Sequence, residues 1–152
     1  MKLAEALILR ADCQKRVEQL KQRLIRSAKA QEGEAPPEDP KLLIDELERT
    51  LSTLVDLIKR INRTNSITEF QEGIFLSDIL AAREILLMKR GAYSDLANSA
   101  SVVQDRYTRS EVKFISTVSV SEMQNRVDEI SKQYREIDSR IQEANWRVDL
   151  AD

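Results

Sequence analysis

The sequence predicts a mainly α protein with four long helices in an antiparallel bundle or coiled-coil arrangement and a small β element. One observation is composition: charged residues make up 33% of the 152 residues, while glycine and proline occur three times each, which is typical of long helices. The other is that apolar residues recur at helical spacing in four separate stretches. These stretches predict helices over residues 3–31, 41–63, 77–100 and 120–148. A chain of this length suits one domain, so we expect a single helical domain over residues 1–152.

The first helix has apolar residues at heptad spacing, with Arg10 and Ser27 as polar interruptions. A turn that contains all three prolines of the chain follows it. In this turn Asp39 is expected to cap the second helix, with Pro40 as its first residue. The second helix carries an apolar stripe that is wider than a two-stranded seam and suits a bundle of three or more helices. Because the turn is short, the first two helices are expected to be antiparallel neighbours.

The last helix has the most regular pattern of the chain. Its heptad seam consists of Met123, Val127, Ile130, Tyr134, Ile137, Ile141, Ala144 and Val148. Ser119 and Glu122 have the spacing of a capping box, so the helix is expected to begin near Val120. Tyr134 is expected in the core, whereas Trp146 lies off the seam and is expected to face solvent in a lone bundle.

The small β element is predicted from residues 66–76 and 111–118. Residues 66–76 contain two short apolar stretches around a three-residue loop that ends in Gly73, which fits a bulged hairpin. Residues 111–118 alternate and are rich in β-branched side chains, so a strand here is expected to pair with the hairpin, which would be marginal in water by itself. Ser77, directly after the hairpin, is expected to cap the third helix.

The composition excludes several chemistries. The chain has no histidine, which removes histidine-based triads and the common zinc ligand sets. Cys13 is the lone cysteine, and we expect a core thiol, with a reactive nucleophile as the alternative. Gly33, Gly73 and Gly91 lie far apart, so there is no glycine-rich phosphate loop. We therefore expect no catalytic residues, no metal and no cofactor, and we lean away from an enzyme without excluding one.

The sequence also predicts where the protein acts. Its first residues are charged and lack the apolar block of a secretory signal. The longest uninterrupted apolar runs are four residues long, far short of the roughly 20 residues that a spanning helix needs. We therefore expect a cytoplasmic protein with no membrane partner.

Several stretches of the chain look familiar. They are Ile61 to Asn65, Gln104 to Phe114, Arg140 to Trp146 and the opening from Lys2 to Leu24. With these stretches, nearly the whole chain resembles a family of small bacterial proteins often labelled septicolysin, a family without an established function. The label implies a cytolysin, but the residues supply neither an export signal nor a membrane-inserting segment, so we set that activity aside.

Three classes of function compete. We expect first a helical scaffold or interaction protein that self-associates as a dimer or a higher oligomer, because its apolar stripes are wide. One alternative is a coiled-coil nucleic-acid binder, similar in outline to the N-terminal arm of seryl-tRNA synthetase. It would use cations of the first helix, namely Lys21, Arg23, Arg26 and Lys29, although no aromatic platform accompanies them. The other alternative is a binder of a small anionic ligand, or an enzyme.

This last alternative rests on a polar cluster where the helical pattern stops. Its candidate ligand-binding residues are Asn62, Arg63, Asn65, Arg106, Tyr107, Arg109 and Lys113. Guanidinium groups bind carboxylates and phosphates bidentately, so converging arginines would form an anion site. The competing structural hypothesis is that these arginines pair with Glu69, Asp105 or Glu111 and only hold the loops in place.

Overall fold

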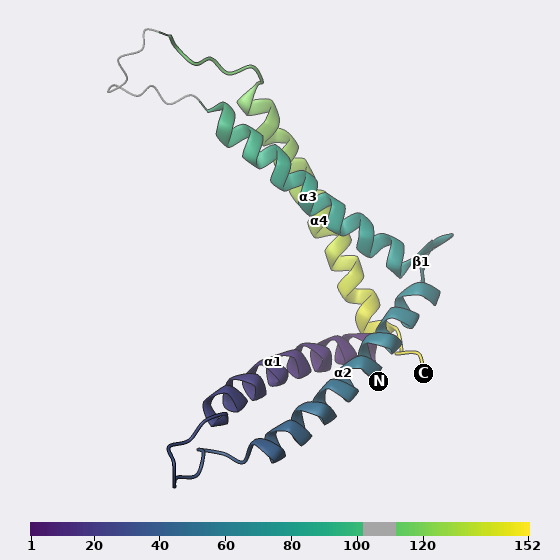
Figure 1. Ribbon diagram of the computed structural model, residues 1–152. Helices are drawn as coiled ribbons and strands as arrows, with labels where there is room; N and C mark the ends of the chain where they lie inside the picture. Colours follow the sequence, from purple (N-terminus) through teal and green to yellow (C-terminus); the bar gives the residue numbers. More distant parts are fainter. Residues whose placement is uncertain (102–111) are drawn as a thin grey trace. The chain divides into compact units, whose positions relative to one another are not determined.

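A computed structural model describes residues 1–101 and 112–152, and in these residues helices dominate (Figure 1). The helices are α1 (Leu3–Ser27), α2 (Pro40–Ile67), α3 (Leu76–Ala100) and α4 (Val120–Arg147). The strands β1 (Glu69–Gln71) and β2 (Ile74–Phe75) form an antiparallel hairpin between α2 and α3. The predicted class, mainly α with four helices and a small β element, is confirmed.

The chain divides into two compact units. The first comprises Met1–Phe75 and Gln142–Asp152, and the second comprises Leu76–Ile141. Helix α4 therefore belongs to the second unit up to Ile141, and its last residues belong to the first. That the two units form one domain stays a prediction from chain length.

In the first unit, α1 and α2 lie side by side and run antiparallel (Figure 1). Buried and half-buried residues recur at heptad spacing on both helices and form the seam between them. On α1 they are Leu3, Ala6, Arg10, Cys13, Val17, Leu20, Leu24 and Ser27. On α2 they are Pro40, Leu43, Leu47, Thr50, Leu54, Leu57, Ile61 and Thr64. The two polar residues that interrupt the sequence pattern thus lie in the seam itself, and Nε of Arg10 and Oγ of Ser27 are buried without a hydrogen-bond partner among the described residues.

Burial along this seam is uneven. Where α1 begins and α2 ends, Leu3, Ala6, Ile61 and Thr64 are at most 1% exposed. Toward the turn between the helices Leu20 and Leu43 are also buried, but most seam residues are only half-buried: Arg10, Cys13, Val17, Leu24, Pro40, Leu47, Thr50 and Leu54. Two helices alone therefore leave much of their seam in contact with water.

The fully covered end of the seam is closed by both ends of the chain. The amide of Leu3 donates to the carbonyl of Val148, and the amide of Leu150 donates to the carbonyl of Met1, each at 2.9 Å. Leu150 is 8% exposed, and Ala144 in the last turns of α4 is 4% exposed. The segment Val148–Asp152 thus completes a core that the first two helices begin.

In the second unit, α3 and α4 are antiparallel neighbours. Nη1 of Arg83 lies 2.5 Å from Oδ1 of Asp138, and Nη1 of Arg126 donates to the hydroxyl of Tyr93 at 3.2 Å. The guanidinium of Arg90 lies over the ring of Tyr134, 5.7 Å from its centroid. Tyr134 is half-buried in the seam of α4, so this aromatic residue contributes to the contact between the two helices.

Local capping signals are largely confirmed. Oδ1 of Asp39 accepts a hydrogen bond from the amide of Lys41 at 2.9 Å, and Pro40 is the first residue of α2. Oγ of Ser119 accepts from the amide of Glu122 at 3.2 Å, and α4 begins at Val120 as predicted. The prediction that Ser77 caps the third helix is wrong, because α3 begins at Leu76, directly after β2.

Two predicted helix ends are wrong, and packing explains both. Helix α1 ends at Ser27 rather than at residue 31, because the next seam positions are Gln31 and Glu34, which would gain nothing from burial. Helix α2 continues to Ile67 rather than ending at residue 63. Its extra turn places Thr64 in the seam, where it is 1% exposed.

The β element is smaller than the sequence predicts. The bulged hairpin is present: its register is irregular between Glu69 and Gln71, and Gly73 has a φ of 74°, which favours glycine. The predicted third strand is wrong for the described residues 112–118, which form no strand, and residue 111 lies outside the described part. Side chains such as that of Phe114, which is 89% exposed, gain no burial here, and strand propensity has little effect without a sheet edge to pair with.

The core at the end of α2 predicts a clear difference between two alanine substitutions. Ile61→Ala removes a side chain that is 1% exposed and should lower the free energy of unfolding by about 2–5 kcal/mol. Leu42→Ala, at a residue that is 66% exposed, is the control and should change it by less than about 0.5 kcal/mol. Urea unfolding followed by circular dichroism measures both, and equal effects would contradict the described core.

Candidate functional site

The structure places the predicted polar cluster in three different ways. Asn62, Arg63 and Asn65 lie in the last turns of α2, so they belong to a helix and not to a loop. Lys113 is exposed in the coil before α4, in the other unit. The remaining candidates lie outside the described residues, together with two acidic residues named as their partners: Asp105, Arg106, Tyr107, Arg109 and Glu111. Of the candidate ligand-binding residues, the described part of the chain thus brings together only Asn62, Arg63 and Asn65.

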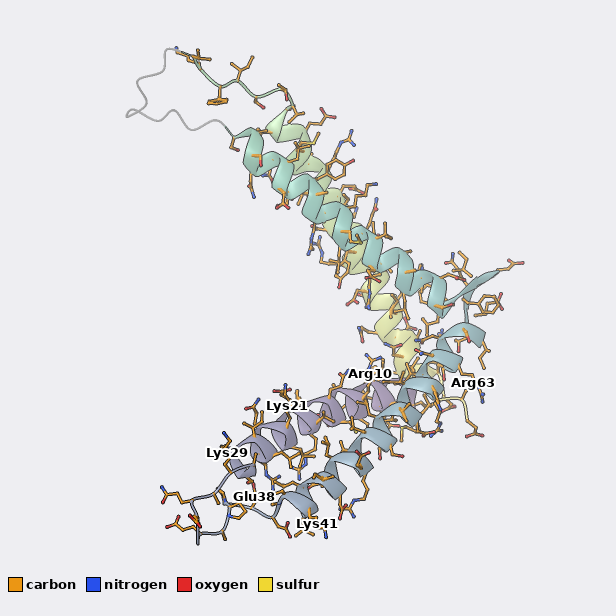
Figure 2. All side chains as sticks on the ribbon, viewed as in Figure 1. Arg10, Lys21, Lys29, Glu38, Lys41 and Arg63 are labelled. Atoms are coloured by element: carbon orange, nitrogen blue, oxygen red, sulfur yellow. The ribbon has the colours of Figure 1, made fainter. Side chains whose placement is uncertain are left out.

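Arg63 has a defined partner within the first unit. Its Nη1 donates to the carbonyl oxygen of Asp152 at 2.5 Å, and Figure 2 shows its place near the end of α2. One turn earlier, Nε of Arg60 donates to the carbonyl of Ala151 at 2.9 Å. Nη2 of Arg60 also lies 3.7 Å from Oδ1 of Asp152. Two arginines of α2 therefore hold the segment Val148–Asp152 mainly through its backbone.

Thr64 makes the buried contact at the same place. Its hydroxyl oxygen accepts a hydrogen bond from the amide of Ala151 at 2.9 Å and donates to the carbonyl of Arg60 at 2.8 Å. Because Thr64 is 1% exposed, these bonds satisfy a hydroxyl that water does not reach. We call the set of Met1–Leu3, Arg60–Thr64 and Val148–Asp152 the terminal junction.

Lys2 also binds the same segment through Asp149, and it binds Arg147, the residue before the segment. Its Nζ lies 2.9 Å from Oδ1 of Asp149 and donates to the carbonyl of Arg147 at 3.1 Å. The hydrogen bond from Lys2 lowers the pKa of the Asp149 carboxyl. The amide of Lys2 donates to Oε2 of Glu5 at 2.7 Å, which satisfies the start of α1. The terminal junction therefore has a structural role, because Lys2, Arg60 and Arg63 already bond to acceptors of the same chain. We call this set of bonds the clasp.

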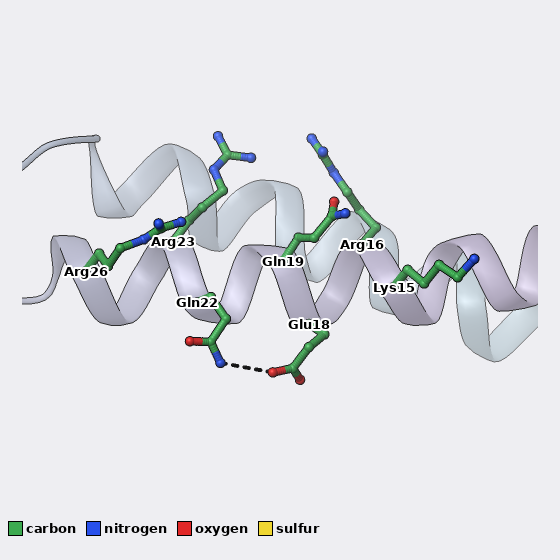
Figure 3. Close-up of a pocket in the computed structure, with 7 residues that line it drawn as sticks. All are labelled: Lys15, Arg16, Glu18, Gln19, Gln22, Arg23 and Arg26. Atoms are coloured by element: carbon green, nitrogen blue, oxygen red, sulfur yellow. Dashed lines mark hydrogen bonds between the residues drawn. The ribbon is translucent and has the colours of Figure 1, made fainter.

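Another polar feature of the first unit lies along α1. A shallow groove there is lined by Lys15, Arg16, Glu18, Gln19, Gln22, Arg23 and Arg26 (Figure 3). Gln22 donates to Glu18 at 3.0 Å, and Figure 3 shows this pair on the side of α1 opposite to Arg16 and Arg23. The side-chain hydrogen bond from Gln22 lowers the pKa of the Glu18 carboxyl, and the charge of Lys21 adds to the effect.

Two of these arginines are bound to α2 and to the turn before it. Nε of Arg16 donates to Oε1 of Glu46 at 2.9 Å, and Nε of Arg23 donates to Oε2 of Glu38 at 2.9 Å. These hydrogen bonds lower the pKa of both carboxyl groups. Neither pair can be recognised from the sequence, because Arg16 and Glu46 are 30 residues apart and Arg23 and Glu38 are 15 residues apart. If the first two helices are aligned as antiparallel neighbours, Arg16 lies opposite Glu46, and Arg23 lies near the turn that contains Glu38.

A second groove follows the polar side of the α1–α2 pair. It is lined by Leu9, Asp12, Cys13, Arg16, Glu46, Arg49, Thr50 and Thr53. Cys13 is half-buried in the seam and forms no disulfide. Among the described residues no group of histidine, cysteine or acidic side chains is arranged to hold a metal ion. The same residues contain no helix that is both long and apolar enough to cross a membrane.

These features define a protein of paired antiparallel helices, closed at one end by a clasp of its own termini. The chain belongs to the family of unknown function DUF6847, whose model matches residues 10–150. Among solved structures it is similar to one described as a functionally unknown conserved protein from Corynebacterium diphtheriae, with 46% identity, a TM-score of 0.93 and 99% of each chain covered. The comparison with curated proteins gave no match. The resemblance to proteins labelled septicolysin stays a resemblance.

Thr64 provides a test of the terminal junction. Thr64→Val keeps the shape of the side chain but leaves the amide of the half-buried Ala151 without its acceptor, which should cost about 1–3 kcal/mol of unfolding free energy. Thr53→Val is the matched control, because the Thr53 hydroxyl is exposed and bonds only within its own helix. The amide of Ala151 should also exchange faster with deuterium in Thr64→Val, and unchanged exchange would contradict the clasp.

The ion pairs of Arg16 with Glu46 and of Arg23 with Glu38 predict how the stability of the fold depends on pH. The carboxyls of Glu38 and Glu46 have pKa values lowered from the ordinary 4.5. They therefore stabilise the fold above that value, and this contribution is lost as pH falls through the lowered pKa values. The double variant Glu38→Gln and Glu46→Gln should show a smaller loss of stability below pH 4.5 than the wild type.

The control for this pH profile is a second double variant, Glu32→Gln and Glu34→Gln, which changes two exposed residues of the turn. Unfolding free energies from urea titrations at a series of pH values measure all three proteins. The control should follow the wild type. A Glu38 and Glu46 variant with the wild-type profile would show that these pairs do not contribute.

Proposed function

We propose that the protein is a helical scaffold that works by association of its helix faces, first with a second copy of itself. The observation that carries this proposal is a set of large apolar side chains on the outside of α3. Ile85 is 58% exposed, Met88 is 64% exposed and Leu96 is 40% exposed. Exposed apolar side chains that form a contiguous patch are typical of an interaction site.

These side chains form a second stripe on α3. Its residues, at spacings of three and four, are Ala81, Ile85, Met88, Ala92 and Leu96, and all five are exposed. The contacts with α4 come from another face of the helix, on which Arg83 and Tyr93 lie. Residues spaced by three and four share one face, so α3 has two apolar faces and α4 covers one of them.

Neither alternative function gains a specific observation. An anion site at the end of α2 would need Arg63, which donates to the carbonyl of Asp152. A nucleic-acid site on α1 would need cations of which Arg23 is already paired with Glu38. We also propose a cytoplasmic location, as expected from the sequence.

Self-association predicts the mass of the protein in solution. A chain of 17.5 kDa should give at least twice that mass by light scattering at about 50 μM, a concentration above the dissociation constant of even a micromolar complex. Analytical ultracentrifugation over a dilution series should show the mass falling toward that of one chain. A mass of one chain at every concentration would contradict the proposal.

A further inference from the structure

We propose that one side of the α1–α2 pair binds the same side of a second copy, so that two helix pairs form a four-helix bundle between chains. This inference rests on the proposed function, and it assigns the contact between two copies to the α1–α2 pair rather than to the outer stripe of α3. The surface, called here the apolar side, consists of Ile25 of α1 and Ile44, Leu51 and Val55 of α2. Their exposed fractions are 59%, 47%, 38% and 47%.

The position of these residues relative to the seam places them together. Each directly follows a seam residue: Ile25 follows Leu24, while Ile44, Leu51 and Val55 follow Leu43, Thr50 and Leu54. One residue corresponds to a rotation of about 100° around a helix. In two antiparallel helices that face each other, residues that follow the seam lie on one side of the pair, and residues that precede it lie on the other. The same rule also places exposed polar residues on this side, so its apolar part lies mainly on α2; these are Gln14, Glu18 and Lys21 of α1 and Glu48 of α2.

The second groove confirms this geometry from the opposite side. Asp12 and Arg16 on α1 directly precede seam residues, as do Glu46, Arg49 and Thr53 on α2, and all five line that one groove. The side that precedes the seam therefore carries charged residues, with the bond from Arg16 to Glu46, and also the exposed apolar residues Leu9 and Leu42. The apolar side lies across the seam from it.

The burial of the seam indicates what the α1–α2 pair lacks. At the terminal junction a further part of the chain covers the seam, and there Leu3 and Ile61 are at most 1% exposed. Along the rest of the pair Val17, Leu47 and Leu54 are only half-buried. Ile58, which also follows a seam residue, is half-buried as well. Another helix pair against the apolar side would cover these residues, as in a four-helix bundle.

The whole face of the helix pair that carries the apolar side has the size of a stable interface. Helix α1 has 25 residues, so at 1.5 Å per residue the pair is about 38 Å long. With helix axes 8–10 Å apart, two helices present a face roughly 20 Å wide, which gives a footprint of about 750 Å². A standard interface buries about 800 Å² on each partner. A two-fold dimer uses the same patch twice, so a second copy is the occupant that we propose.

The test places a charge on the apolar side of the full chain. Leu51→Glu and Val55→Glu each bury an uncompensated carboxylate in the proposed interface, which should raise the dimer dissociation constant by at least about tenfold. Thr53→Glu is the matched control, since it adds the same charge to the opposite side of the same helix. Circular dichroism should show unchanged helix content, because all three positions are exposed. Sedimentation velocity over a dilution series measures the constant.

The outcomes separate this inference from the proposed function. Weaker dimers in Leu51→Glu and Val55→Glu, with a wild-type constant in Thr53→Glu, support the apolar side. Unchanged dimers in both variants overturn it. A third variant, Ile85→Glu on the outer stripe of α3, identifies the rival surface: if it alone dissociates the dimer, this inference fails while the proposed function stands. A wild type that is monomeric at every concentration overturns both.

Discussion

Two helices that pack against each other share one seam, and this constraint governs the rest of the structure. A helix pair can bury one stripe of each helix, so any further apolar residue stays in water unless another element covers it. In the first unit the seam has polar residues as well as apolar ones, with Arg10 half-buried and Ser27 buried. Full burial of the seam between α1 and α2 therefore requires other parts of the protein, or a partner, to cover the ends and sides of the helix pair.

At one end the chain supplies that cover itself. Segments far apart in sequence meet at the terminal junction, where the partners of Arg60, Thr64 and Lys2 lie 91, 87 and 145 residues away. Most of these bonds go to backbone groups of Val148–Asp152. Side chains of α2 and backbone groups of Met1 and Leu3 thus satisfy a segment that has no regular structure of its own. The cations of this end therefore serve the fold.

The sequence predicts the features that depend on neighbouring residues. Asp39 with Pro40 and Ser119 with Glu122 set helix starts through bonds within three residues, and both starts are confirmed. It fails where distant contacts decide. The end of α2 depends on the burial of Thr64, and a strand over residues 112–118 would need a sheet edge that no local pattern reveals.

The candidate site follows the same rule. The sequence identifies Arg63 as a polar residue of interest, but its partner lies 89 residues further along the chain. The bond from Arg16 to Glu46 cannot be predicted from neighbouring residues for the same reason, because it requires knowing how α1 and α2 are aligned. Local patterns thus predict which residues are polar and where helices lie, while the partners of those residues come from the tertiary structure.

The most direct test of the account asks whether association covers the seam of the α1–α2 pair. Amide hydrogen exchange of residues 47–58 is compared at protein concentrations well above and well below the dissociation constant. The account predicts slower exchange in this segment at high concentration and a much smaller change in residues 61–64, which the terminal junction already protects. Equal exchange of residues 47–58 in the monomer and in the oligomer would contradict it.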